Sequence, residues 1–235
     1  AELTQLMEAA ESNAASLVEL ENAFSAPLEF GTAGLRGKLG AGPNRMNRVV
    51  VQQAAAGLAQ YLIDNGHQGE AIVIGFDARF NSDIFARDTA QIFSAAGFTT
   101  YIFDHVVPTP VLAFAIRDLK TCAGVMVTAS HNPPQDNGYK VYLGDGRQIV
   151  SPADKNILTR IREVRDVRSV GMAQEVSIVD AAVEERYIAS LAQAINDGPT
   201  NAQQRADVVS VYTAMHGVGW NSVQEATLRC DFKVP

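Results

Sequence analysis

Residues 71–78 read AIVIGFDA, a short apolar run that is rich in β-branched side chains. Such runs are typical of strands that are buried between helices in a parallel sheet. Two further runs have the same character, TTYIFDHV at 99–106 and GVMVTA at 124–129. We expect these three segments to form the centre of one sheet.

Helical patterns separate the apolar runs. One helix is expected at 46–63, a second from Ser82, as its cap, to about Ala96, and a third from Pro108 to about Leu119. Strands that alternate with helices of about 10–15 residues indicate βαβ units. The sequence therefore predicts an α/β fold, a three-layer α/β/α domain with a mixed, mostly parallel sheet.

The segments on either side of this core differ from it. The first 25 residues have helical spacing and predict an N-terminal helix, and the glycine-rich stretch at 30–42 is expected to be a loop. Residues 139–150 predict a hairpin that turns at Asp145-Gly146. Ser151 and Pro152 are expected to start another helix.

The C-terminal part predicts a change of domain. A helix is expected at about 180–196, a polar linker at 196–205 and a new strand at 208–215. Too few residues follow for a second core. We therefore expect one domain at 1–204 and the beginning of an incomplete second domain at 205–235.

Composition limits the class of protein. The 235 residues are 47% apolar, and the net charge of −7 argues against nucleic acid or an anionic membrane as a partner. Cys122 and Cys230 match no metal or redox spacing, so reduced thiols are expected. With neither a signal peptide pattern nor a long apolar run, a cytoplasmic protein is predicted.

The chemistry is concentrated at 128–140, which reads TASHNPPQDNGYK. Ser130 directly follows a buried strand, so its hydroxyl is expected at the strand's carboxyl end, where open α/β sheets bind ligands. His131 is adjacent, and Lys140 lies on the next strand. Ser130 lacks the G-x-S-x-G surroundings of a serine hydrolase nucleophile, which disfavours acyl transfer.

TASHNP followed by NGYK resembles the phosphoserine loop of the α-D-phosphohexomutases, the phosphoglucomutase and phosphomannomutase family. FGTAGLRG at 30–37 resembles that family's N-terminal substrate loop, and GFDARFNS at 75–82 resembles its next glycine-and-arginine loop. VYTAMHGVG at 211–219 is similar to the start of the family's second domain.

The resemblance implies a reversible shift of phosphate between the 1- and 6-hydroxyls of a hexose. Phospho-Ser130 would donate to the sugar, and a bisphosphorylated sugar would return its other phosphate to Ser130. A Mg²⁺ ion would bridge the phosphoserine and three aspartates of the second domain, which makes Ser130 a metal ligand.

The resemblance also implies roles for other residues. The catalytic residues would be Ser130, His131, Lys140 and Arg36. The substrate-binding residues would be Thr32, Arg36, Arg79, Asn132 and Lys140. Each also has a purely structural interpretation: Arg79 could pair with Asp77 across a turn, and Asn132 could shape the loop.

Three family motifs are not found in the sequence: the aspartate metal loop, the sugar-reading loop and the late phosphate-binding loop. We therefore expect a fragment that does not turn over substrate alone. A phosphopentomutase of the same family, a metal-dependent phosphatase and a non-catalytic phosphosugar-binding module stay open as alternatives. Ala33 weakly favours the glucose and pentose branch over aminosugar mutases, and the oligomeric state is left open.

Overall fold

The structure is a computed structural model that describes residues 2–32 and 34–235. Ala33, whose identity bears on the substrate branch, lies outside the described residues. Within the described part of the chain, no helix is both long enough and apolar enough to cross a membrane.

Helices and strands alternate through most of the chain. The helices are α1 (Glu2–Ala10), α2 (Ala14–Phe24), α3 (Arg48–Asp64), α4 (Ser82–Ala95), α5 (Thr109–Asp118), α6 (Ala153–Glu163), the short 3₁₀ helix η1 (Val167–Ser169), α7 (Ala182–Asn196), α8 (Ala202–Ala206) and α9 (Trp220–Arg229). The strands are β1 (Leu35–Lys38), β2 (Ala71–Phe76), β3 (Thr99–Ile102), β4 (Ala123–Val127), β5 (Asp136–Leu143) and β6 (Ser177–Ile178).

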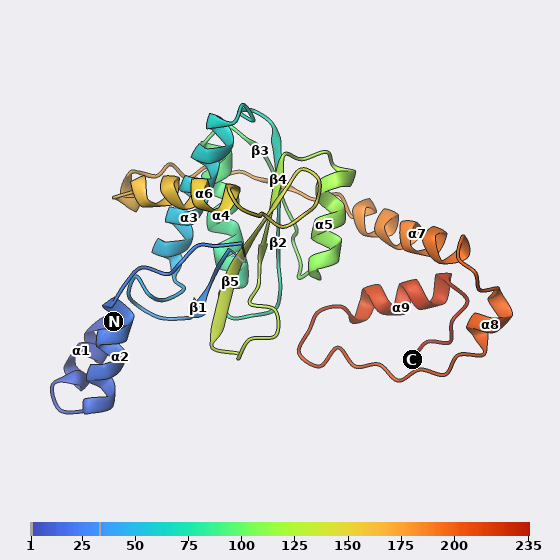
Figure 1. Cartoon of the computed structure of the whole chain (residues 1–235), viewed down its shortest axis with the longest axis horizontal. Coiled ribbons are helices and arrows are strands. Elements are labelled where there is room, and N and C mark those ends of the chain that lie inside the picture. The colour runs from blue at the N-terminus through green and yellow to red at the C-terminus, as the bar shows by residue number, and fades with distance from the viewer. Residues whose placement is uncertain (1, 33) are drawn as a thin grey trace.

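The six strands form one mixed sheet in the order β1-β5-β4-β2-β3-β6. The strands β4, β2, β3 and β6 pair in parallel, whereas β5 runs antiparallel to both β4 and β1. Figure 1 shows α3, α4 and α6 on the left of this sheet and α5 on its right. The α/β class, the three layers and the mixed sheet are confirmed.

Two apolar cores lie on opposite faces of the sheet, because successive strand side chains point to opposite faces. Ile72 and Ile74 of β2 are buried in the core that α3, α4 and α6 cover. Val73, between them, is buried in the core that α5 and α7 cover. This two-sided burial explains why the central strands are continuously apolar.

The N-terminal region differs from the expectation in two places. The expected single helix is a pair, α1 and α2, which projects from the sheet in Figure 1. Asn13 separates them, and its side chain accepts hydrogen bonds from the backbone of Ala15 and Ser16 to cap α2. The expected loop at 30–42 contains β1, whose strand character depends on pairing with β5.

Two local expectations are also corrected. The N-cap of α4 is Asn81, and Ser82 is its first residue, with Oγ donating instead to Asp77 at 2.9 Å. The second arm of the expected hairpin does not form a strand, and only Gln148 makes a bridge, to Tyr142. The turn at Asp145-Gly146 is present, with Gly146 in the left-handed region at φ 77°.

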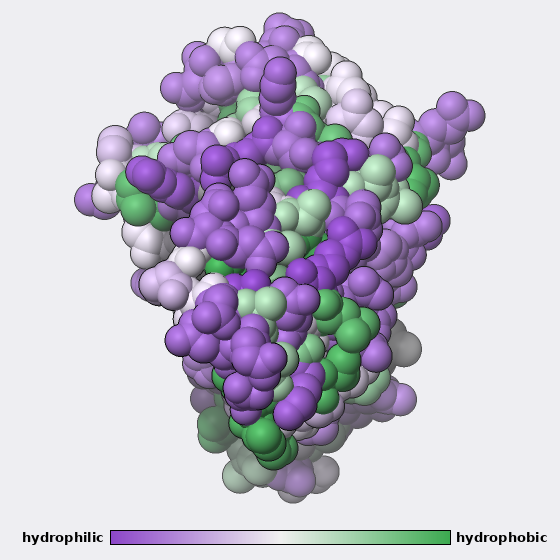
Figure 2. All heavy atoms as spheres, turned by 90° about the vertical axis from the view of Figure 1, so that its right-hand side faces the viewer, coloured by the Kyte–Doolittle hydropathy of each residue, from purple (hydrophilic) through white to green (hydrophobic). Residues whose placement is uncertain are grey.

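The strand expected at 208–215 is wrong, because this segment is irregular and pairs with no strand among the described residues. Val209 and Val211 are 84% and 98% exposed. Figure 2 views the molecule from the side of α7–α9 and shows apolar groups scattered among polar ones.

The linker expected at 196–205 contains most of α8, whose buried Arg205 donates to the Cys230 carbonyl at 2.8 Å. The boundary at 204/205 stays a prediction.

Candidate functional site

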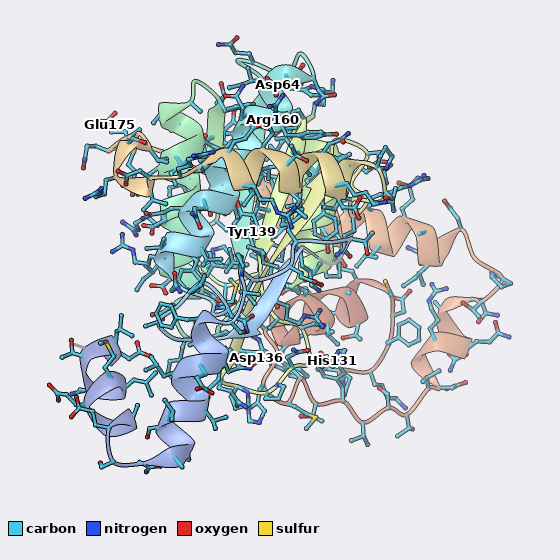
Figure 3. The ribbon with its side chains drawn as sticks, turned by 60° about the vertical axis from the view of Figure 1, so that its left-hand side comes forward. Asp64, His131, Asp136, Tyr139, Arg160 and Glu175 are labelled. Atoms are coloured by element: carbon cyan, nitrogen blue, oxygen red, sulfur yellow. The ribbon has the colours of Figure 1, made fainter. Side chains whose placement is uncertain are left out.

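The candidate site is the loop between β4 and β5, at the carboxyl end of β4. Ser130 is exposed there and has φ 58°, a left-handed conformation that is uncommon for a residue with a side chain. Figure 3 shows His131 of this loop and Asp136, the first residue of β5, at one end of the molecule, far from Asp64 and Arg160 at the other end. Strained residues of this kind gather at functional sites.

A partly buried polar relay fixes the backbone of Ser130. Its N–H donates to Thr128 Oγ1 at 2.9 Å, and Thr128 Oγ1 donates to Asp77 Oδ2 at 2.5 Å. The other oxygen of Asp77 accepts from the backbone N–H of Arg79 and from Ser82 Oγ. The loop after β2 therefore holds the serine loop after β4.

Arg79 binds the main chain of the serine loop. Its Nη2 donates to the carbonyls of Ser130 and Asn132 at 2.7 and 2.8 Å, and its Nη1 donates to those of Pro133 and Asp136 at 2.9 and 3.0 Å. Its Nε forms an ion pair with Asp77 Oδ2 at 3.5 Å. The four N–H groups of the two Nη atoms therefore all donate to carbonyls around Ser130.

A second arginine reaches the loop from β1. Arg36 Nη1 donates to Asn132 Oδ1 at 3.2 Å, and Asn132 Nδ2 donates to Asp136 Oδ2 at 2.9 Å. Arg36 is exposed, and this is the one hydrogen bond of its side chain within the described residues. The remaining guanidinium donors of Arg36 are available to an anion, as bidentate binding of phosphate requires.

Lys140 lies on β5, opposite Met126 of β4. Partial burial lowers the pKa of Lys140, the positive charge of Arg36 lowers it further, and Asp77 opposes the change. A lowered pKa suits a lysine that exchanges a proton during catalysis.

His131 stands beside the candidate nucleophile. Its Nδ1 lies 3.5 Å from Ser130 Oγ, at the outer limit of a hydrogen bond. Both side chains are exposed. His131 is therefore near enough to contact a group bound at Ser130 Oγ, although it forms no short hydrogen bond with that oxygen.

Close packing brings the loop that contains Thr32 to the same strand. Gly34 has φ +75°, and a Cβ atom there would lie 1.9 Å from the carbonyl oxygen of Tyr139. Only glycine permits this approach. Thr32 is exposed, and its carbonyl accepts from Gln148 Nε2 at 3.0 Å.

The structure thus brings Arg36, Arg79, Asn132 and His131 to the loop of Ser130. Lys140 lies close enough to Arg36 for the arginine's charge to lower the lysine's pKa. Sequence reasoning missed the roles of Thr128 and Asp136, which organise the loop, and the contact that joins Thr128 to Asp77. Buried Asn137 also helps to shape the loop, because its side chain donates to the carbonyl of Phe80 at 2.9 Å. A polar residue at the end of an apolar strand, as at Thr128, was the available signal.

The chain matches known proteins throughout this region. The family described as phosphoglucomutase/phosphomannomutase, alpha/beta/alpha domain I, matches residues 27–168. A protein of Haemophilus influenzae named probable phosphomannomutase is 46% identical over 196 residues, which is 81% of this chain and 39% of that protein. Human phosphopentomutase is 38% identical, with 92% of this chain and 38% of that protein covered. A Staphylococcus haemolyticus phosphoglucomutase is 35% identical, with 91% and 39% covered.

A solved structure agrees with this assignment. The crystal structure of a Thermus thermophilus protein, described as a phosphomannomutase, superposes with a TM-score of 0.75 at 27% identity. The match covers 89% of this chain and 45% of that one. This chain spans about two fifths of the length of the curated relatives it matches. It belongs to the phosphoglucomutase/phosphomannomutase family, the α-D-phosphohexomutases, and contains the family's domain I.

Proposed function

We propose that this chain provides the phosphoserine part of the active site of a sugar phosphomutase, with Ser130 as the group that takes and gives the phosphoryl group. The main support for this proposal is that the backbone of the loop is held in place around the exposed hydroxyl of Ser130. Thr128 and Arg79 hold the Ser130 backbone on both sides, and the Ser130 Oγ faces solvent. Phosphoryl transfer depends mainly on such positioning and on nearby positive charge.

The proposed reaction begins with phosphorylated Ser130. The bond between phosphorus and Ser130 Oγ breaks while a hydroxyl oxygen of the sugar phosphate bonds to phosphorus. That hydroxyl loses its proton, and Ser130 Oγ gains one. The bisphosphorylated sugar then reorients, and the reverse step returns its other phosphate to Ser130, which gives the isomeric monophosphate.

Four side chains have proposed roles around this step. Lys140 exchanges the proton at the reacting oxygens, which its lowered pKa supports. His131 assists at Ser130 Oγ, and Arg36 binds phosphate oxygens with its remaining donors. Asn132 orients Arg36.

Two of the expected substrate ligands, Arg79 and Thr32, already have groups engaged by other parts of the protein. We propose that Arg79 acts as a positioning residue, because its donors already face carbonyls of the loop and Asp77. Thr32 is proposed to contact the sugar phosphate through its exposed side chain, since its carbonyl is engaged by Gln148.

Magnesium is the cofactor that this family generally uses, and Ser130 is proposed as one of its ligands. Mg²⁺ prefers about six oxygen ligands in an octahedron. Within the described residues, no group of three acidic, histidine or cysteine side chains gathers at Ser130. Both Asp77 carboxylate oxygens already accept hydrogen bonds. The residues present therefore do not form a magnesium site by themselves.

The sugar is proposed to be a hexose or pentose phosphate. The relatives named above include a phosphomannomutase, a phosphopentomutase and a phosphoglucomutase, which supports the class of substrate and leaves the particular sugar open. The complete gene product should be assayed with glucose, mannose and ribose 1-phosphates. The sugar with the highest kcat/KM identifies the substrate.

The nucleophile is tested by mass spectrometry of the complete gene product after incubation with a sugar bisphosphate. One phosphate on the peptide that contains Ser130, absent from Ser130→Ala, is the expected result. Phosphate on another residue would overturn the assignment. The 235-residue chain alone is expected to show no turnover, and enzyme-like turnover by it would refute its proposed status as a fragment.

A non-catalytic phosphosugar-binding module is the alternative. It would bind a hexose phosphate but exchange no phosphate with Ser130, so the same experiment distinguishes the two. A phosphatase would release inorganic phosphate instead of forming a sugar bisphosphate. The cytoplasmic location stays a prediction from the sequence.

A further inference from the structure

A second group of reactive side chains lies at the end of the sheet opposite Ser130. His67 and Glu70 are in the turn between α3 and β2, and Cys122 directly precedes β4. Ser130 follows the other end of β4. Figure 3 shows Asp64, the last residue of α3, at the end of the molecule opposite His131.

The three side chains converge. One ligand atom from each residue, a ring nitrogen, a carboxylate oxygen and Cys122 Sγ, lies within 4.8 Å of the others. His67 Nδ1 and Glu70 Oε2 are 3.1 Å apart. In a tetrahedral zinc site with bonds of about 2.0–2.3 Å, neighbouring ligand atoms lie about 3.3–3.8 Å apart. Small side-chain rotations of the partly exposed His67 and Glu70 would close the remaining gap to Cys122.

The main chain holds these residues in place. The His67 N–H donates to Leu62 at the end of α3, and the Glu70 N–H donates to the His67 carbonyl at 3.1 Å, which closes the turn. The Cys122 N–H donates to the Ala71 carbonyl at 2.8 Å, so the backbone of Cys122 is held against the first residue of β2. Ligands on a rigid backbone cost little entropy when a metal binds.

A hollow of about 440 Å³ adjoins the three side chains and gives a metal a route of entry. Asn65 and Thr121 line it and offer further polar groups. Lys120 also lines it and is unfavourable to a cation, but its side chain is exposed and can turn away. A site with three protein ligands that opens on a hollow has a fourth position for water.

We propose that His67, Glu70 and Cys122 form a binding site for Zn²⁺ or a similar borderline-soft divalent metal, with a water molecule in the fourth position. Mixed nitrogen, oxygen and sulfur ligands favour such metals over Mg²⁺, which takes oxygen ligands. One carboxylate and one thiolate together neutralise the metal's two charges. This site is separate from the magnesium site that is proposed at Ser130.

Burial, and next the negative charge of Glu70, raise the pKa of the Cys122 thiol to about 11, so the thiol is neutral in the metal-free protein. On binding, the metal–sulfur bond replaces the S–H bond and one proton is released to solvent. No oxidant or reductant is needed for this step.

The test uses the full 235-residue chain after treatment with a chelator. Zn²⁺ binding is measured by equilibrium dialysis and metal analysis, and Co²⁺ serves as a spectroscopic substitute. We expect one metal per chain, a thiolate-to-cobalt band in the near ultraviolet and a higher thermal midpoint with Zn²⁺. Glu70→Gln and His67→Gln, which alter partly exposed side chains, should each weaken binding at least tenfold while the fold is kept.

Cys122→Ser should abolish the thiolate band, and Cys230→Ser is the matched control because Cys230 is also a buried free cysteine. The proposal is overturned if no metal binds, if the band survives Cys122→Ser, or if it is lost in Cys230→Ser. If Cys122→Ser does not fold, the two partly exposed variants decide the question, because unchanged affinity in both would equally overturn the site. In that outcome, His67 and Glu70 form only a turn-stabilising pair.

Discussion

The guanidinium of Arg79 donates a 2.7 Å hydrogen bond to the main-chain carbonyl of Ser130, although 51 residues separate the two along the chain. The same side chain donates to three more carbonyls of the loop. A planar guanidinium can satisfy these acceptors together, whereas the three rotating donors of a lysine cannot. The position of the candidate nucleophile therefore depends on a residue of the neighbouring βα loop.

Replacing Arg79 should loosen the serine loop. We expect Arg79→Ala to lower the free energy of unfolding by about 2–3 kcal/mol, since hydrogen bonds from a charged group are lost in a largely buried place. In the complete protein, kcat should fall by about 10²-fold, because small misplacements of reacting groups cost that much. Arg79→Lys should not restore it, and Arg147→Ala, which alters an exposed arginine, should be neutral. A rise in KM at unchanged kcat would instead support direct substrate binding by Arg79.

Thr128→Val tests the relay on the other side of Ser130. The hydroxyl of Thr128 accepts from the Ser130 N–H and donates to Asp77, and the residue is 4% exposed. Valine has a similar shape but leaves both partners unsatisfied, so we expect a loss of about 2 kcal/mol in urea unfolding and slower phosphorylation of Ser130. Thr100→Val is the control, because within the described residues that buried hydroxyl makes one hydrogen bond, to the Phe98 carbonyl at 3.3 Å. Equal losses in both variants, with normal phosphorylation, would contradict the relay.

The central strands could be predicted because burial on both faces leaves a continuous apolar run in the sequence, as in β2. The strand β1 could not, because its character comes from long-range pairing of residues such as Arg36 with Gly138 rather than from its own glycine-rich sequence. The opposite error occurred at 208–215. The sequence there has a strand-like pattern, but no described strand lies beside it, and a pattern without a partner forms no ladder.

The residues of the candidate site also fall into those that the sequence could predict and those that it could not. The serine, its histidine and the following lysine lie in one stretch of sequence and could be found there. The support from Asp77 and Arg79 could not, because it exists only once the ends of β2 and β4 lie side by side. His67, Glu70 and Cys122 match no metal spacing for the same reason: the sheet brings them together from distant parts of the chain.

Gly34→Ala tests the close approach of the first loop to β5. An alanine Cβ would collide with the Tyr139 carbonyl, and the backbone is already in the left-handed region. Gly66→Ala is a matched control, since Gly66 has φ +87° but no described heavy atom lies within 4 Å of the new Cβ. The control should lose about 1 kcal/mol from backbone strain alone. Gly34→Ala should lose clearly more in chemical denaturation, and equal losses would show that the loop moves away freely.

Hydrogen exchange tests the description of the segment before α9. No main-chain N–H of residues 209–214 donates a hydrogen bond within the described part of the chain. Exposed amides without such bonds exchange from the native state, whereas those of a central strand require extensive unfolding. Residues 209–214 should therefore exchange fastest and 123–127 among the slowest. Strong protection of 209–214 would indicate that the segment is paired as a strand in solution.

Lys140 should make stability depend on pH in a defined direction. Burial and the charge of Arg36 lower its pKa in the folded chain below the ordinary value of 10.5. Between the lowered pKa and 10.5, the unfolded chain binds a proton that the folded chain has released, so the free energy of unfolding rises as pH rises through that interval. Below the lowered pKa both states are protonated, and the full penalty of the buried charge applies.

Lys140→Met removes both the penalty and the slope. The variant should be more stable than the parent chain at pH 7, and the difference should shrink as the pH approaches 10.5, measured by urea unfolding at several pH values. Lys155→Met, which alters an exposed lysine of α6, corrects for the general effect of removing a positive charge. In the complete protein, Lys140→Met should lower kcat by about 10²–10⁴-fold if the lysine exchanges the reacting proton. A stabilised variant with unchanged kcat would show that the lowered pKa reflects crowding beside Arg36 and not catalysis.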